Sequence, residues 1–214
     1  MTINQPQNHA SRVWLETLSA IRISGTDVAP RGQPTRELLQ HTVVVFLTYP
    51  VVHVPERKLS YKFLAAEALW ILSGDNTVAG IAPYNDHIAV FSDDGVIFNG
   101  AYGPPITAQL NYVLAKLRED RDTRQAVLTI WRPNPAASKD IPCTVALGFS
   151  IRDDELNVHA FMRSSDVWLG LPYDIFNFSM LGVKVACALN AEQPFIQVRL
   201  GRLFLTAASS HLYN

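Results

Sequence analysis

The chain has 214 residues, of which 48% are hydrophobic and 17% charged, and its 18 Lys and Arg against 19 Asp and Glu give a net charge of -1. This length suits one domain with a full hydrophobic core, so we predict a single domain over residues 1–214. The balanced charge offers no overall field for a nucleic-acid backbone or an anionic membrane, which argues against both as partners. A charged fraction below the roughly 25% of ordinary soluble domains leaves surface for a second subunit to cover.

The N-terminus and the cysteines indicate a compartment. MTINQPQNHASR has neither the pattern of a secretion signal nor the Arg-rich pattern of a transit peptide. No stretch approaches the run of about 18 apolar residues that a membrane span needs. Two cysteines, Cys143 and Cys187, are too few for a disulfide framework. We therefore expect a reduced, cytoplasmic protein.

The first part of the chain predicts a helix, a loop and a strand. Apolar residues at helical spacing favour a helix over residues 11–22. The Gly- and Pro-rich stretch 24–38 is typical of a loop, where Arg31 between Pro30 and Gly32 allows the backbone to bend around an anion. The β-branched stretch 41–49 predicts a buried strand.

A second helix is predicted from Ser60 to its stop at Gly74. Glu67 lies inside it between apolar neighbours, and is either a residue of the solvated face or a carboxylate that points into a cavity. Residues 84–104 indicate irregular structure with short extended pieces, and residues 105–119 indicate a third helix.

The second half of the chain predicts most of one sheet and a buried helix. Residues 126–131, 145–151 and 156–162 are candidate strands, with a hairpin-like turn at RDDE between the last two. Residues 175–189 form the longest apolar run and predict a central helix, and a final strand over 195–205 leads into ASSHLYN. We expect the candidate strands to lie in one sheet.

The stretch RSSDVWLGLPYDIFNF places Arg163, Asp166 and Asp174 around a Gly-Leu-Pro turn among apolar residues. Charged residues in such surroundings need partners, so they form either an internal ion pair or the wall of a pocket. His211 and Tyr213 alternate, which on a strand puts both on one face, either as hydroxyl-binding donors or as an ordinary strand end.

Cys143 follows Pro142 just before a predicted strand. It is either an inert small hydrophobic residue or, if Arg31, Arg124 and Arg163 converge on it, a nucleophile with a lowered pKa. The chain has no GxSxG, HExxH or P-loop motif. Its six histidines have no ligand-like spacing, so we expect no metal site.

Taken in order, IPC at Cys143, RSSDVWLGLPYDI and HLY resemble the thymidylate synthase family, including its pyrimidine nucleotide hydroxymethylase branch. The resemblance extends through Arg31, EALWILSGD around Glu67, NGAYG around Tyr102 and DTRQAVLTIW. It implies an α/β fold with a large mixed sheet packed with helices, and a homodimer formed sheet to sheet. It also implies small-molecule partners, a pyrimidine nucleotide and a folate.

The resemblance further implies residue roles. Cys143 would add to C6 of the nucleotide, and C5 would attack the one-carbon unit of 5,10-methylenetetrahydrofolate. Glu67 and Tyr102 would order water and move protons, while Asp166 and Gly170 would contact the folate. The nucleotide itself would be held at its 5′-phosphate and 3′-hydroxyl by Arg31, Arg163, Ser164, Arg124 from the neighbouring subunit, His211 and Tyr213.

Asp174 is an informative departure from the family pattern. The resemblance to methylating thymidylate synthases implies Asn at this position, whereas this chain has Asp. An ionised carboxylate only accepts hydrogen bonds, which suits the cytosine amino group and opposes uracil O4. We therefore predict that dCMP is converted to 5-hydroxymethyl-dCMP, with water ending the reaction. The alternatives are a CMP hydroxymethylase, a dUMP methylase, and a catalytically silent relative that binds nucleotide or RNA.

Other departures concern the phosphate clamp, the water network and the folate pocket. Gln125 stands where many synthases have a second Arg, and Thr144 stands where His commonly follows the nucleophile. Residues 88–91 replace family tryptophans, which would favour access of water. The resemblance also implies a closing C-terminal segment after Asn214, which the sequence given does not include.

Overall fold

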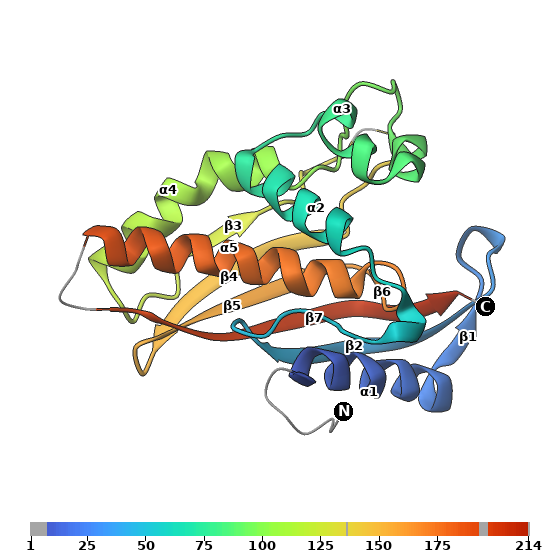
Figure 1. The fold of residues 1–214 in the computed structure, drawn as a ribbon, viewed down its shortest axis with the longest axis horizontal. Coiled ribbons are helices and arrows are strands. Elements are labelled where there is room, and N and C mark those ends of the chain that lie inside the picture. Colours follow the sequence, from blue (N-terminus) through green and yellow to red (C-terminus); the bar gives the residue numbers. More distant parts are fainter. Residues whose placement is uncertain (1–7, 136, 193–196, 214) are drawn as a thin grey trace.

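The computed structural model describes residues 8–135, 137–192 and 197–213. Within these residues a seven-stranded sheet has the order β1-β2-β7-β5-β4-β3, with β6 paired to β7 (Figure 1). The strands are β1 (Thr26–Val28), β2 (Thr35–Phe46), β3 (Val127–Thr129), β4 (Thr144–Arg152), β5 (Glu155–Met162), β6 (Ser165–Asp166) and β7 (Arg199–Tyr213). Because β7 is antiparallel to β2 but parallel to β5 and β6, the sheet is mixed, and the predicted α/β fold is confirmed.

Helices pack on one face of this sheet. They are α1 (His9–Ser24), α2 (Tyr61–Ser73), α3 (Val78–Ile81), α4 (Gly103–Glu119) and α5 (Leu171–Glu192), with short 3-10 turns η2 (Pro30–Gly32), η3 (Pro55–Arg57), η4 (Ala82–Tyr84) and η5 (Asp86–Phe91). Figure 1 shows α5 lying across the sheet, α2 and α4 beyond it, and α1 running beside β2. No helix within the described ranges has the length and apolarity that crossing a membrane requires.

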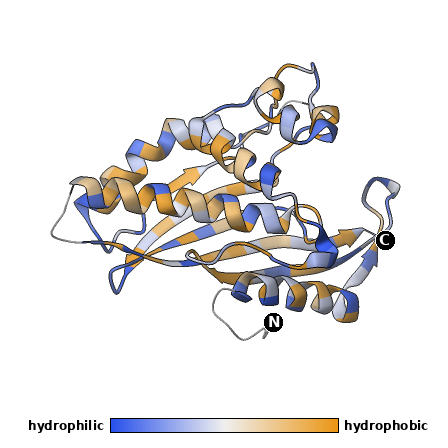
Figure 2. Cartoon of the chain, viewed as in Figure 1, coloured by the Kyte–Doolittle hydropathy of each residue, from blue (hydrophilic) through white to orange (hydrophobic). Residues whose placement is uncertain are grey.

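The main core lies between α5 and the sheet. Ile175, Phe178 and Leu181 are at most 1% exposed and belong to the same buried cluster as the inner residues of β5 and β7. Each such side chain stabilises the fold by roughly 1.5–3 kcal/mol through burial. A Cβ at Gly182 would lie 3.0 Å from Val158 on β5, so glycine lets the helix approach the strand closely. Figure 2 shows the hydrophobic residues along the strands and on α5.

Local signals set the bounds of α2. The Ser60 hydroxyl accepts a hydrogen bond from the Phe63 amide (3.2 Å), which caps the helix N-terminus. Gly74 ends the helix with φ of 81°, a conformation that favours glycine. The predicted helix between these two residues is therefore confirmed, and Glu67 lies within it as expected.

The predicted loop over 24–38 is wrong in part, because it contains β1 and the beginning of β2. Residues 35–39 are largely polar, yet they pair with the end of β7, in a register that joins Thr35 to Tyr213 and Leu39 to Ser209. The predicted final strand is also misplaced: β7 runs from Arg199 through HLY, and residues 195 and 196 lie outside the described residues.

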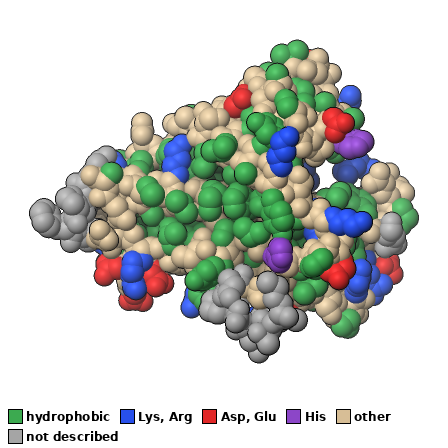
Figure 3. Space-filling view, in the orientation of Figure 1, with side chains coloured by type: hydrophobic (Ala, Val, Ile, Leu, Met, Phe, Trp, Pro, Cys, Tyr) green, Lys and Arg blue, Asp and Glu red, His purple; other side chains and the backbone are tan. Residues whose placement is uncertain are grey.

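The other face of the sheet is accessible and carries exposed apolar side chains among polar ones such as Thr42 and Thr206. Phe161 is 50% exposed, and Phe46, Val127 and Val145 are each at least 36% exposed. Figure 3 shows the opposite face, which bears the helices. There hydrophobic side chains gather over α5 and charged side chains lie toward the margins.

Candidate active site

Two adjoining cavities lie where β4 and β6 begin and β7 ends. The larger cavity has a volume of about 840 Å³ and the inner cavity about 270 Å³, and Phe91 lines both. Among the residues predicted from the sequence, the larger cavity is lined by Arg31, Cys143, Arg163, Ser164, Asp166, His211 and Tyr213. The inner cavity is lined by Glu67, Tyr102 and Asp174. The fold thus brings together residues as distant in the sequence as Arg31 and Tyr213.

Two arginines give the larger cavity its positive charge. Arg163 directs Nε to the Pro142 carbonyl and Nη2 to the Ile141 carbonyl, both at 3.0 Å, so its guanidinium is fixed beside the segment that carries Cys143. Arg31 lies in η2 with φ of 54°, a left-handed conformation that bends the loop as the flanking Pro30 and Gly32 predict. Both side chains are exposed toward solvent and therefore accessible to an anion.

Cys143 lies at the end of the Asp140–Pro142 segment, directly before β4. Burial raises the pKa of its thiol above the usual value, while the nearby Arg163 guanidinium and a hydrogen bond with Ser164 act in the opposite direction. Arginine is thus placed to stabilise a thiolate, but the surrounding protein favours the neutral thiol. A base, or a partner that takes the proton, is needed to make this cysteine a strong nucleophile.

The opposite wall is built by strand register. His211 on β7 faces Glu37 on β2 and Asp166 on β6, and Tyr213 faces Thr35. Successive side chains of a strand alternate between faces, so His211 and Tyr213 project into the same cavity. The rings of these two residues meet edge to face with centroids 5.2 Å apart. The wall therefore combines hydroxyl and imidazole groups with two carboxylates.

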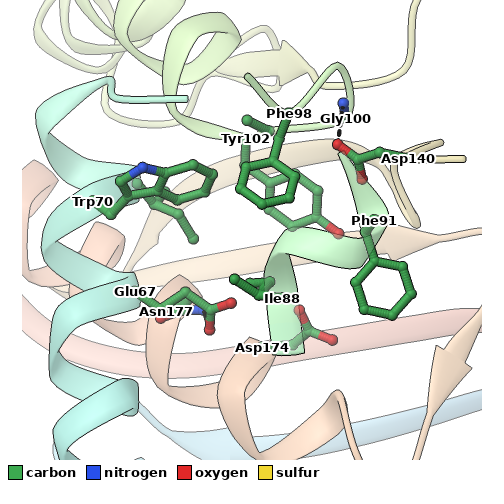
Figure 4. A pocket seen from close by; sticks show the side chains of 12 residues that line it. Glu67, Trp70, Ile88, Phe91, Phe98, Gly100, Tyr102, Asp140, Asp174 and Asn177 are labelled. Atoms are coloured by element: carbon green, nitrogen blue, oxygen red, sulfur yellow. Dashed lines mark hydrogen bonds between the residues drawn. The ribbon is translucent and has the colours of Figure 1, made fainter. Parts of the chain in front are cut away.

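Two acids lie at the base of the inner cavity (Figure 4). Burial raises the pKa of Glu67 to about 7, and a hydrogen bond donated by Asn177 (2.8 Å) acts against that rise. Burial also raises the pKa of Asp174 well above its usual value, with further contributions from the negative charges of Glu67 and Asp166. Both retain some surface toward the cavity but are otherwise enclosed by protein. Burial therefore favours the neutral form of Asp174, and Glu67, whose pKa is about 7, exchanges its proton readily near neutral pH.

The rest of the inner cavity is mostly apolar. Trp70 and Phe98 meet edge to face, and the Tyr102 ring stacks on Phe178. Burial raises the pKa of Tyr102 above its usual value, so its hydroxyl stays protonated. Ile88 and Phe91, from the stretch that departs from the family pattern, line the same cavity. The site thus combines flat apolar walls with a few acidic groups.

Two predicted residues, Arg124 and Gly170, lie outside both cavities, and Asp166 is partly occupied by contacts within its own loop. Arg124 is exposed and does not line either cavity of this chain. Gly170 also lines neither cavity, and its carbonyl accepts the amides of Tyr173 and Asp174 at the start of α5. One oxygen of Asp166 accepts the amides of Trp168 and Leu169, which fixes the WLGLP loop.

Sequence reasoning missed several polar residues that line the cavities, among them Glu37, Asn177 and Asp140. Glu37 accepts a hydrogen bond from Ser209 (2.5 Å) in the larger cavity. Asn177 and Asp140 line the inner cavity. Asn177 follows Asp174 by nearly one helical turn, a signal that was available in the sequence. The positions of Glu37 and Asp140 depend on pairing and loop geometry. Within the described part of the chain, no group of three or more His, Cys, Asp and Glu is placed to hold a metal ion.

Comparison with known proteins agrees with this geometry. The chain is 29% identical over 226 residues to a deoxyuridylate hydroxymethyltransferase of Bacillus phage SP01, a match that covers 95% of this chain and 57% of the relative. It is 31% identical over 190 residues to a deoxyuridylate hydroxymethyltransferase of Pseudomonas phage M6, covering 83% of this chain and 54% of the relative. The chain spans little more than half the length of either relative. The family model described as Thymidylate synthase matches residues 12–214, and the chain therefore belongs to the thymidylate synthase family.

Proposed function

We propose that this chain catalyses C5 hydroxymethylation of a pyrimidine nucleoside monophosphate, with dCMP as the first candidate substrate. The observation that carries the proposal is the convergence of Cys143, Arg31 and Arg163 on a cavity large enough for a nucleotide, next to an inner cavity that contains Asp174. Both curated relatives carry the name of a hydroxymethyltransferase, which supports the reaction type.

The charges in the larger cavity suggest how the nucleotide lies. Arg31, Arg163 and Ser164 form the basic side and would hold the phosphate. His211 and Tyr213 lie on the opposite wall and would bind the 3′-hydroxyl. The pyrimidine ring would then extend past Cys143 toward Asp174. Arg124 of a second subunit would complete the phosphate site.

Covalent catalysis begins at Cys143. Its sulfur adds to C6, which makes C5 a carbanion-like centre able to attack an electrophilic one-carbon unit. Glu67, whose pKa is about 7, can take up and return protons near neutral pH, and Tyr102 can donate a hydrogen bond to an ordered water. These residues line one cavity, as proton transfer at C5 and at the base edge requires.

The inner cavity also fits the folate ring system. Trp70, Phe91 and Phe98 supply flat apolar surfaces for a heteroaromatic ring. Asp166 and Gly170 would contact the folate, Asp166 with the oxygen that is not occupied by the WLGLP loop. When bound, 5,10-methylenetetrahydrofolate supplies a one-carbon unit at the oxidation level of formaldehyde. Water then completes the hydroxymethyl group.

Asp174 would select the base. Its protonation state decides how strongly cytosine is preferred over uracil. An ionised carboxylate suits cytosine with a proton at N3 and opposes uracil O4. The neutral acid that burial favours can donate to cytosine N3 and accept from N4, or donate to uracil O4 and accept from N3–H. The second candidate substrate is therefore dUMP, which the names of the two relatives also favour.

A second subunit would pack against the exposed sheet face. Phe161 and Phe46 give this face the apolar character of a subunit interface, in agreement with the low charged fraction of the chain. A sheet-to-sheet homodimer would bury them and bring Arg124 toward the neighbouring phosphate site.

The proposal is tested by release of tritium from C5 of dCMP, dUMP and CMP in the presence of methylenetetrahydrofolate, with mass analysis of each product. We expect release from dCMP and a 5-hydroxymethyl product. Release from dUMP alone would move the assignment to the second candidate, and a methyl product would identify a methylase. A Cys143→Ala variant should release nothing. If the unmodified protein also releases none from any nucleotide while still binding them, the chain is a binding protein.

A further inference from the structure

Asp140 lies on a wall shared by two cavities. It lines the inner cavity with Glu67 and Asp174, and it also lines a separate cavity of about 80 Å³. The two cavities have Gly100, Ala101 and Asp140 in common. Neither Glu67 nor Asp174 lines the smaller cavity. Asp140 is thus the carboxyl group of the inner cavity that also faces this second space.

The smaller cavity is suited to water. At ~30 Å³ for each molecule in the liquid, its volume accommodates a few waters. Its lining includes the exposed residues Asn99 and Arg132, so it communicates with solvent, and the polar side chain of Ser138 also contributes. It is therefore a solvent-accessible space directly behind the wall of the inner cavity that carries Asp140.

The carboxylate of Asp140 is held in place from one side. The Gly100 amide donates to Oδ2 at 2.6 Å, and the Asp140 amide donates to Ser138 Oγ at 3.0 Å. A Cβ at Gly100 would lie 2.7 Å from Oδ1, so only glycine allows this approach. Figure 4 shows one oxygen bound to Gly100 and the other directed toward Phe91 and the cavity. An oxygen in this orientation is available to a water molecule.

We propose that Asp140 is a catalytic residue of the hydroxymethylation. Asp140 takes the proton from the water that adds to the one-carbon unit, and this water comes from the smaller cavity. This inference rests on the proposed function. Burial raises the pKa of Asp140 above its usual value, which makes it a stronger base than an ordinary aspartate.

In this step water adds to the covalent intermediate and Cys143 is released. The intermediate carries an exocyclic methylene at C5 and the Cys143 sulfur at C6. The water oxygen forms a bond to the methylene carbon, its proton passes to Asp140, and the electrons of the C5–methylene double bond move into the ring. The ring then expels the sulfur from C6 as thiolate and regains its C5–C6 double bond. Nothing is oxidised or reduced.

The reverse of this step provides a test that requires no folate. A 5-hydroxymethyl nucleotide bound to the enzyme loses its hydroxyl to the same methylene intermediate and regains oxygen from solvent. In H2¹⁸O the nucleotide therefore gains heavy oxygen, measured by mass. We expect exchange with 5-hydroxymethyl-dCMP or 5-hydroxymethyl-dUMP. We expect Asp140→Asn to slow it by about 100-fold or more, within the range of general base catalysis.

Two controls separate chemistry from structure. Asp140→Asn should retain tritium release from C5 within a few-fold, since that release precedes water addition. Asp140→Ala should regain exchange when formate is added, but not when chloride is added at equal ionic strength. Asp122→Asn, at an exposed turn, should exchange at the rate of the unmodified protein.

The outcomes distinguish the two proposals. Exchange by Asp140→Asn at the unmodified rate would refute the role of Asp140, and so would an equal loss of exchange and tritium release without rescue by formate. Absence of both exchange and tritium release in the unmodified protein would instead refute the proposed function.

Discussion

At the scale of single residues, the chemistry depends on acids that share the inner cavity. Glu67 and Asp174 are close enough for the charge of one to raise the pKa of the other, and both are enclosed by apolar side chains. The number of protons that these two acids hold near neutral pH therefore differs from that of two ordinary carboxylates. A neutral Asp174 resembles an amide in offering one donor and one acceptor, which widens the choice of base.

Replacing Asp174 tests the selection of the base. Asp174→Asn should raise the ratio of kcat/KM for dUMP over dCMP by roughly 10- to 100-fold, because an ionised Asp174 facing uracil O4 leaves an unpaired buried polar contact that costs about 1–3 kcal/mol and that the amide removes. Steady-state kinetics with both nucleotides measure this ratio, and Asp122→Asn serves as the surface control. An unchanged ratio would mean that Asp174 already meets the base as a neutral acid or does not contact the base edge.

Glu67 should make stability dependent on pH. Its pKa rises from 4.5 to about 7 on folding, so the folded state holds the proton more tightly than the unfolded chain. Stability relative to Glu67→Gln is therefore greatest below pH 4.5 and falls as the pH rises to about 7, by up to about 3 kcal/mol. Urea unfolding at pH 4.5 and pH 8 measures this difference. An equal effect of the substitution at both pH values would contradict it, and the exposed Glu56→Gln provides the control.

At the scale of elements, the WLGLP loop (residues 168–172) joins Asp166 of the larger cavity to Asp174 of the inner cavity, and other segments of the chain hold it in place. Arg57 in η3 donates to the carbonyls of Trp168 (2.6 Å) and Leu169 (3.3 Å), and its guanidinium lies over the Trp168 ring. Trp14 of α1 donates to the Val167 carbonyl at 2.6 Å. Two segments from the first part of the chain thus fix the backbone from which Asp174 follows.

Removing Arg57 should loosen this loop. Arg57→Ala is expected to speed hydrogen exchange of the Trp168 and Leu169 amides, and to raise KM for the nucleotide more than it lowers kcat. Arg57→Lys should not restore protection, because an ammonium cannot bind two carbonyls and cover the indole in the same geometry. Hydrogen exchange read by mass spectrometry tests this. Protection equal to that of the neighbouring Lys58→Ala control would show that Arg57 is dispensable.

At the scale of the whole molecule, the sheet has one face packed by helices and one face exposed to solvent. Central residues of the exposed face pair across strands, with Phe204 opposite Val44 on one side and His159 on the other. Exposed apolar side chains such as Phe161 are costly to leave in water, although polar groups such as Thr42 and Thr206 lie among them. A second copy of the chain would cover this face with the same residues.

A charge in this face should prevent dimer formation. Phe161→Glu, at a residue 50% exposed on β5, is expected to yield monomers in sedimentation experiments. Its activity should also fall, since Arg124 would no longer reach the neighbouring site. Leu69→Glu, at an exposed position of α2, is the matched control and should leave the oligomeric state unchanged. Sedimentation of Phe161→Glu as a dimer would exclude this face as the interface.

The sequence alone determined the helices, the central strands and the family, because apolar periodicity, Ser60, Gly74 and the motifs around Cys143 are local signals. Only the tertiary structure decided the beginning of β2, which is polar and forms by pairing with β7. The same pairing places Glu37 beside His211, and loop packing on Gly100 places Asp140 between two cavities. Burial likewise decided the protonation of Asp174, since its pKa depends on neighbours distant in the chain. Local sequence specifies which groups are present, whereas pairing and enclosure fix which of them meet and what charge they carry.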